Sequence, residues 1–291
     1  MKKMYLVTTK HLEKSLWFRD AEDFRVAMNY IAIVAWKHPE VIVWGHIYMS
    51  NHAHFILLGT EEDVIAFVNS VKQRYSLYYR RKYGVKKLLR RNFLDVKEIP
   101  EDNEAREKTV AYVITNCVSA NICAHPSQYE WGSGNTLFNP TPPQGKPLSE
   151  FSTRKLKRLL RTEEEGLPDD WLIGPGGYIL PSMYVDVKAV EALFRKPQRM
   201  NYFIATSSKT KMRLEAGEGL PAFKDQTILA ALPDLCMSLF QKRSFKELAS
   251  DEQAELAKQI RFRFSADATQ IARVCGVSYA EAAELLDSLQ F

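Results

Sequence analysis

Two histidines separated by one residue stand at the start of an apolar run, where they could support metal chemistry. His52 and His54 directly precede the run Phe55–Leu58. In a β-strand, residues i and i+2 project from the same face, so the two imidazoles could hold one ion. A purely structural histidine pair is the alternative. Only His125 follows His54 among the six histidines of the chain, which disfavours hydrolytic metal barrels because they need further ligands downstream.

A tyrosine and an asparagine four residues apart form a second group with chemical potential. On a helical wheel Tyr112 lies nearly opposite the centre of an apolar stripe, so the core does not require it. The stripe consists of Val110, Val113, Ile114 and Cys117. Asn116 follows Tyr112 by one turn, so its amide oxygen and the tyrosine hydroxyl can approach one point. A surface tyrosine bonded to a neighbour is the alternative.

A cluster of basic residues lies between Asp63 and Asp95, with no acidic residue among them. It consists of Lys72, Arg74, Arg80, Arg81, Lys82, Lys86, Lys87, Arg90 and Arg91. Lysine and arginine neutralise phosphates, and interleaved aromatic rings can stack on unpaired bases. The cluster therefore predicts a DNA-binding surface, with a solvated helix face as the alternative. Tyr75 and Tyr78 follow the apolar spacing of this segment and are predicted to be core residues.

The composition is that of a soluble globular protein. The chain has 291 residues, of which 46% are apolar and 26% charged, and its net charge is +5. These values exclude disordered and fibrous classes. The longest apolar runs stay far below the roughly 18 to 20 residues that span a bilayer. We expect a cytoplasmic, nucleoid-associated protein with no membrane partner, and its four cysteines show no zinc or redox spacing.

Strands and helices in the first half of the chain must position the histidine pair, Tyr112 and Asn116. The expected strands are Tyr5–Thr9, Val41–Met49 and His52–Leu58. The expected helices are Ala21–Lys37, Val64–Tyr83 and Asn103–Cys123. This order indicates an α+β sandwich with one sheet face covered.

A segment rich in proline and glycine, Gly134–Pro147, predicts a domain boundary. We expect a first domain at 1–133, a linker at 134–150 and a mostly α-helical C-terminal domain at 151–291. The helices expected there are Ser152–Arg161, Val185–Arg195, Thr227–Gln241, Phe245–Ala266, Ala268–Cys275 and Tyr279–Leu289. No specific function is apparent for residues 151–267.

The segment 268–289 matches the helix-turn-helix template. Gly276 occupies the turn, and Ser278 with Glu281 forms a predicted capping box for the last helix. That helix carries three acidic residues and no basic residue, whereas a helix in the major groove faces phosphates on both sides. A structural or protein-contact role is therefore favoured over DNA contact.

Three features of the sequence together resemble the single-tyrosine HUH transposases of the REP-associated group. They are the segment Tyr48-Met-Ser-Asn-His-Ala-His-Phe-Ile-Leu57, the basic helix after it, and the segment Tyr112-Val-Ile-Thr-Asn116. That family has Met-Pro-Asn-His-hydrophobic-His in the strand and Tyr-x-x-x-Asn-Pro in the later helix. Ser50 and Cys117 stand where the family usually has proline. Phe18-Arg19-Asp20 and Tyr129–Ser133 add to the resemblance, which covers residues 1–133.

The resemblance implies a ferredoxin-like antiparallel sheet with helices, called the HUH core. It also implies a divalent cation, magnesium or manganese, held by His52, His54 and Asn116, with Tyr112 as the nucleophile. The implied activity is nicking and strand transfer on single-stranded or hairpin DNA through a 5′-phosphotyrosine intermediate. A bound cation suits this role because tyrosine, with a pKa near 10, is a weak nucleophile at neutral pH.

Two other classes of function remain compatible with the same residues. One is a non-catalytic DNA-binding protein or regulator on the same fold, in which the histidines are structural. The other is a metal-dependent phosphodiesterase that uses water, in which Tyr112 is dispensable. The sequence leaves open the target DNA and whether the chain acts as a monomer or a homodimer.

Overall fold

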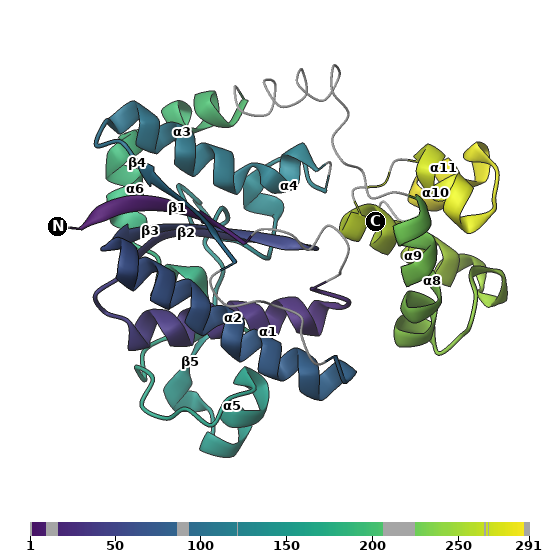
Figure 1. The fold of residues 1–291 in the computed structure, drawn as a ribbon, viewed down its shortest axis with the longest axis horizontal. Helices are drawn as coiled ribbons and strands as arrows, with labels where there is room; N and C mark the ends of the chain where they lie inside the picture. Colours follow the sequence, from purple (N-terminus) through teal and green to yellow (C-terminus); the bar gives the residue numbers. More distant parts are fainter. Residues whose placement is uncertain are drawn as a thin grey trace.

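A four-stranded antiparallel sheet lies between two layers of helices, with a separate group of helices beside it (Figure 1). The computed structural model describes residues 2–9, 17–85, 93–120, 122–205, 225–264, 266 and 268–287. The strands are β1 (Lys3–Thr8), β2 (Ile42–Met49), β3 (His52–Gly59) and β4 (Asp95–Ile99). Their order across the sheet is β2-β3-β1-β4, and all three pairings are antiparallel. The predicted α+β class is confirmed.

Helices α1 (Ala21–Lys37) and α2 (Glu61–Tyr83) cover one face of the sheet. The bounds of α1 are those that the sequence predicts. This helix begins where the Asp20 side chain accepts a hydrogen bond from the Asp23 backbone N–H. Thr60 caps α2 in the same way, and α2 ends at Gly84, whose positive φ of 71° suits a residue without a side chain.

The other face is covered by α3 (Asn103–Ile114), α4 (Asn116–Ser119) and α6 (Val187–Phe194). Side chains alternate along β3: Phe55 packs in the cluster of α1 and α2, and Ile56 packs with α3. The expectation of a sheet with one covered face is therefore wrong. Val110, Val113 and other residues of α3 supply the second apolar layer.

The structure differs from the sequence-based expectation in three elements. The expected helix Phe245–Ala266 is divided into a 3₁₀ turn at Phe245–Glu247 and a helix at Ser250–Phe264. The edge strand β4 is absent from that expectation, because its residues Asp-Val-Lys-Glu-Ile are mostly exposed and its charges hide the strand pattern. The expected helix Asn103–Cys123 is interrupted at Thr115. There the Thr115 hydroxyl donates to Ala111 O, and the Asn116 side chain donates to two other helix carbonyls. Such side-chain bonds compete with helix continuation.

The hydrophobic packing does not divide at the predicted linker, residues 134–150. The strand β5 (Lys146–Pro147) lies within this segment and pairs with β6 (Leu172–Ile173) in a small sheet, and the helix α5 (Thr153–Leu160) follows the segment. Leu180 belongs to the cluster of α1 and α2, and Phe194 and Phe203 belong to the cluster of α3. Residues up to about 204 thus share their cores with the first 133 residues.

The described residues also form short 3₁₀ turns, namely η1 (Pro126–Gln128), η2 (Leu148–Glu150), η3 (Pro181–Met183) and η4 (Phe245–Glu247).

A separate hydrophobic cluster is formed by four C-terminal helices. They are α8 (Asp225–Phe240), α9 (Ser250–Phe264), α10 (Ala268–Cys275) and α11 (Tyr279–Asp287). Gly276 lies in the turn between α10 and α11 with φ of 70°. The predicted capping box is confirmed: Ser278 N donates to Glu281 Oε2 at 2.7 Å, and Glu281 N donates to Ser278 Oγ at 3.2 Å. Residues 288 and 289 of the predicted segment lie outside the described residues.

Arg263 of α9 connects this helical group to the first domain. Its side chain is 1% exposed, and Nη1 donates to Phe18 O at 3.3 Å. A weaker contact joins Arg19 to Asp234 at 3.9 Å. None of the helices in the described ranges combines the length and the hydropathy that a membrane span needs.

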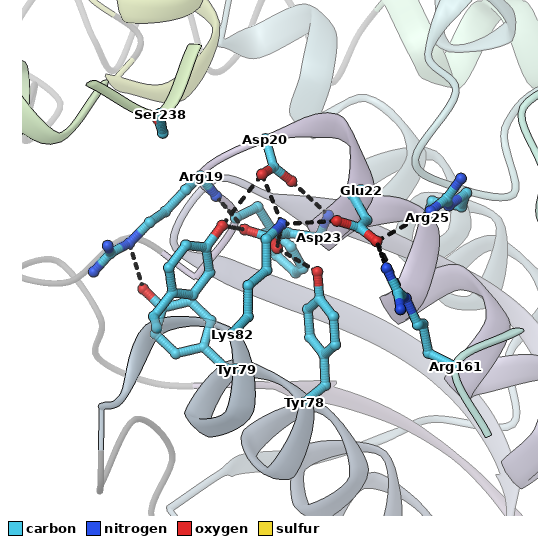
Figure 2. Close-up of polar contacts among 12 residues, drawn as sticks. Arg19, Asp20, Glu22, Asp23, Arg25, Tyr78, Tyr79, Lys82, Arg161 and Ser238 are labelled. Carbon is cyan, nitrogen blue, oxygen red and sulfur yellow. Dashed lines mark hydrogen bonds and ion pairs between the residues drawn. The ribbon is translucent and has the colours of Figure 1, made fainter. Parts of the chain in front are cut away.

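A buried carboxylate joins the start of α1 to the end of α2 (Figure 2). Asp23 is 0% exposed, and its Oδ2 accepts from Arg19 N at 2.7 Å and from the Tyr83 hydroxyl at 2.8 Å. Its Oδ1 accepts from the Tyr78 hydroxyl and from Lys82 Nζ, both at 2.8 Å. Four donors thus converge on one carboxylate, which fixes how the two helices meet.

Replacing Asp23 by Asn should destabilise the protein by about 3 kcal/mol, because it removes the charge from a buried site that several donors share. Urea unfolding followed by circular dichroism measures this effect. Glu163→Gln is the control, since the Glu163 side chain is 90% exposed and surface changes usually stay within about 0.5 kcal/mol. Equal unfolding midpoints for Asp23→Asn and the unmodified protein would contradict the assigned role of Asp23.

Candidate active site

His52 and His54 lie at the start of β3 and project from the sheet face that α3 covers. In the strand register, His54 lies opposite Thr8 of β1 and Ile47 of β2. The two imidazole centroids are 4.9 Å apart, with the ring planes at 88°. The prediction that both rings project from one face is confirmed, and their separation allows both to reach one ion.

Each of the two histidines has a partner at its Nδ1 atom. His52 Nδ1 lies 2.8 Å from Asn51 Oδ1, and His54 Nδ1 lies 2.9 Å from Thr8 Oγ1. An amide oxygen only accepts hydrogen bonds, so this contact is a hydrogen bond when His52 Nδ1 carries the proton, a tautomer that leaves Nε2 as the metal-binding atom. Histidines that bind metals usually donate their other ring N–H in this way. In this tautomer His52 fits a cation bound through Nε2, and the Thr8 hydroxyl can accept from His54 Nδ1 in the same way.

Tyr112 lies against this histidine pair. Its ring centroid is 5.6 Å from that of His54, with the planes at 76°. The residue is 41% exposed, whereas Val113 and Ile114 beside it are buried. This confirms that Tyr112 lies off the apolar stripe of its helix. Partial burial raises the pKa of the Tyr112 phenol above its ordinary value, so the hydroxyl is protonated at neutral pH and must lose its proton to act as a nucleophile.

Asn116 begins α4, one turn after Tyr112, and is 4% exposed. Its Nδ2 atom donates to Tyr112 O at 2.9 Å and to Val113 O at 3.2 Å. These bonds tie the amide to the backbone of the tyrosine and direct Oδ1 away from the helix carbonyls. The structure thus brings Asn116 next to Tyr112, and its role as a metal ligand stays a prediction.

The types of ligand atom at this site indicate which cations it could bind. In the part of the chain that the structure describes, no group of three or more His, Cys, Asp or Glu residues could hold a metal ion. The predicted set is instead two imidazoles and one amide oxygen. Imidazole suits manganese better than magnesium, and both accept amide oxygen. The assignment to magnesium or manganese stays a prediction.

The segment Tyr129–Ser133 packs against β2, the strand beside the histidines. In the sequence this segment is notable only as part of the family resemblance. The Tyr129 hydroxyl donates to Tyr48 O at 2.6 Å, and Tyr48 N donates to Trp131 O at 2.9 Å. A Cβ on Gly132 would lie 3.0 Å from His46 O, so glycine permits this close approach to β2. No sequence pattern indicates this pairing, nor Thr8 as the partner of His54.

The predicted DNA-binding cluster is only partly available for phosphates. Lys72 is 5% exposed, with Nζ 3.4 Å from Phe93 O, so it has no access to DNA. Arg74 pairs with Glu164 at 2.6 Å, and Lys82 pairs with Asp20 at 2.6 Å (Figure 2). These three residues are therefore removed from the predicted surface. The sequence count missed the acids because they come from other elements.

The remaining members of the cluster divide into two groups. Arg80 and Arg81 are exposed near the end of α2. Lys86, Lys87, Arg90 and Arg91 lie outside the described residues. The core assignment of Tyr75 and Tyr78 is confirmed, since both are buried.

Comparisons with known proteins give little beyond this geometry. Neither the protein-family models nor the curated proteins contain a match to this chain. Among solved structures, the chain is similar to a REP-associated tyrosine transposase bound to a REP hairpin. The identity is 13%, the match covers 46% of this chain and 78% of that chain, and the TM-score is 0.39. At that TM-score the likeness carries no argument, and the site described above rests on this chain's own residues.

Replacing His52 by Ala should weaken binding of Mn²⁺ by at least about 10-fold, because it removes one of two imidazole donors. Thr8→Val should have a smaller effect in the same direction, since it releases only the Nδ1 partner of His54. Titration of free Mn²⁺ by electron paramagnetic resonance measures both. His38→Ala is the control, because His38 follows α1 and bonds to Glu40. Equal Mn²⁺ affinity in the His52 and His38 variants would exclude this site.

Replacing Lys72 by Met should leave DNA affinity unchanged and keep or raise stability at pH 7. Burial lowers the pKa of Lys72 to about 8, so the unfolded chain binds this proton more tightly. The unmodified protein should therefore gain stability relative to Lys72→Met as the pH rises from about 8 to about 10.4. Urea unfolding across this range, with the exposed Lys97→Met as control, measures the difference. A clear loss of stability in Lys72→Met at pH 7 would contradict this account.

Proposed function

We propose that the protein is a metal-dependent tyrosine transposase, a DNA strand transferase that cleaves and rejoins single-stranded or hairpin DNA through Tyr112. The observation that carries the proposal is the position of the Tyr112 ring, 5.6 Å from that of His54, which itself lies 4.9 Å from the ring of His52. A potential nucleophile thus lies beside a pair of potential metal ligands on one face of the sheet. The order of these residues in the sequence resembles the single-tyrosine HUH transposases.

The connectivity of the first domain supports the same proposal. Its elements follow each other as β1-α1-β2-β3-α2-β4, and the strand order is β2-β3-β1-β4. This order fits a split βαβ, or ferredoxin-like, sheet. In it β3 is an inner strand, so the histidines at its start lie between β1 and β2.

The proposed reaction moves a phosphodiester linkage from DNA to the protein. Tyr112 Oη attacks the phosphorus of a phosphodiester and forms a new P–O bond, while the bond from phosphorus to the 3′ oxygen breaks. The phenol loses its proton to solvent or a base, and the 3′ oxygen takes up a proton and leaves as a hydroxyl. The 5′-phosphotyrosine keeps a phosphodiester, so a later 3′ hydroxyl can reverse the step on another strand.

The chain's own residues orient the nucleophile. The rings of His54 and Tyr112 meet edge to face, and Thr8 holds His54 at its Nδ1 atom. Asn116 binds the carbonyl of Tyr112, which fixes the turn that carries the phenol. A divalent cation held by His52, His54 and Asn116 would polarise the phosphate and offset its negative charge. Such a cation is needed most where burial raises the pKa of the phenol, as it does here.

Replacing Tyr112 by Phe should abolish covalent attachment of DNA, because the change removes the attacking oxygen and keeps the ring that contacts His54. The measurement uses single-stranded DNA labelled at its 3′ end, incubated with protein and Mn²⁺ and separated on a denaturing gel. Attachment through a 5′ phosphate retains this label. The adduct should fall at least about 1,000-fold, while DNA affinity stays within about twofold. Tyr202→Phe is the matched control, since Tyr202 is 65% exposed.

Each other result of this experiment identifies a different nucleophile or a different function. An adduct that persists in Tyr112→Phe means that another residue is the nucleophile. Cleavage at equal rates without any adduct supports a phosphodiesterase that uses water. Binding without a strand break in the unmodified protein supports a DNA-binding protein or regulator on this fold.

A further inference from the structure

A cavity of about 590 Å³ lies where α1, α2 and α5 meet. Figure 1 shows α5 on the side of α1 and α2 that faces away from the sheet. Residues of three distant segments line the cavity, among them Glu22, Arg81, Lys82, Lys157, Arg158 and Arg161. The candidate active site lies on the opposite face of the sheet, so this cavity is a separate feature.

Five cationic side chains and two carboxylates line the cavity, and three of the cations have carboxylate partners. Lys82 pairs with Asp20, Glu22 and Asp23, Arg161 pairs with Glu22 at 2.5 Å, and Lys157 pairs with Glu165 at 2.7 Å. The pairs of Lys82 and Arg161 hold the walls together (Figure 2). With the pairing of Lys157, three of the five positive charges that line the cavity are already compensated.

Arg81 and Arg158 are the exception. Both are exposed, and neither has a carboxylate within 4.0 Å among the residues whose positions are described. Arg81 comes from α2 and Arg158 from α5, so two elements more than 70 residues apart each contribute one open guanidinium to the same cavity. A guanidinium presents a planar fork of donors that matches two oxygens of a phosphate.

The positive charge continues beyond the cavity along α5, where Arg154 is exposed one turn before Arg158. On α2, Arg80 is exposed next to Arg81, but adjacent residues of a helix point to different sides. Residues four apart on a helix lie on the same side. A row of charges suits a polyanion better than a single phosphate, because each phosphate of a strand can meet its own cation.

We infer that the cavity and its arginines form a groove between α2 and α5 that binds the sugar-phosphate backbone of a DNA segment. The choice of DNA rests on the proposed function. Because the groove and the Tyr112 site lie on opposite faces of the sheet, the strand held in the groove is a different segment from the one that Tyr112 attacks. The groove would anchor flanking DNA, independent of its sequence, while the active site acts elsewhere on the molecule.

The test uses the full chain carrying Tyr112→Phe, so that no covalent adduct disturbs the binding equilibrium. Fluorescence anisotropy measures the affinity for a labelled single-stranded oligonucleotide over a range of salt concentrations. Adding Arg81→Gln and Arg158→Gln should weaken binding and reduce the slope of log affinity against log salt by about 1.4, at about 0.7 for each phosphate that is no longer neutralised. The double change of Arg81→Lys and Arg158→Lys should retain most of the slope, because it keeps both charges.

The matched control is the double variant Lys2→Gln and Lys97→Gln, which removes two exposed charges outside the groove, one before β1 and one on β4. An equal loss of affinity in this control would overturn the groove, because the effect would then reflect net charge alone. An unchanged salt slope in the double arginine variant would overturn it too. If inorganic phosphate or a mononucleotide displaces the oligonucleotide at equal phosphate concentration, the cavity binds small anions and the inference of a DNA groove is wrong.

The adduct measurement separates failure of the groove from failure of the proposed function. If the unmodified chain forms an adduct but the double arginine variant binds DNA as its parent does, the groove is wrong and the strand transferase stands. If no adduct forms but the double arginine variant binds DNA more weakly than its control, the groove stands and the chemistry of Tyr112 is wrong. Absence of any DNA binding by the parent overturns both.

Discussion

The alternation of side chains along β3 is the constraint on which the candidate site depends. This strand is an inner strand with helices over both faces, so each successive residue must fit one of two cores. Ala53 and Phe55 point to the core of α1 and α2, which leaves His52 and His54 together on the side of α3. A shift of the register by one residue would place both imidazoles among the aromatic rings of the other core. The polar pair is tolerated because it lies at the end of the strand, where Thr8 and Asn51 provide polar partners.

Features governed by local periodicity were predictable from the sequence. The shared face of the two histidines follows from the strand period of two, and the exposure of Tyr112 follows from the helical period. The bounds of α1 and the capping box of Ser278 and Glu281 follow from short-range signals as well. In each case the information lies within a few residues of the feature, so no knowledge of the tertiary structure is needed.

Features that depend on distant segments were not predictable in this way. The acids that neutralise Arg74 and Lys82 lie far from them in sequence and meet them only through tertiary packing. The same holds for the burial of Lys72 and for the packing of residues after the linker against the first domain. The break at Thr115 has a local cause, but the side-chain bonds that produce it compete closely with a regular helix. The pattern of residue types does not indicate whether these side-chain bonds or a continuous helix is more stable.

The buried side chain of Arg263 determines how independent the C-terminal helices are. Burial lowers the pKa of this guanidinium to about 10, and the nearby negative charges of Asp20 and Asp23 oppose that effect. Moving the helical group away would return a cation to water and leave the Phe18 carbonyl without its donor. The helical group is thus electrostatically coupled to the start of α1. Displacement of these helices would therefore remove a positive charge from beside the carboxylates that hold α1 and α2 together.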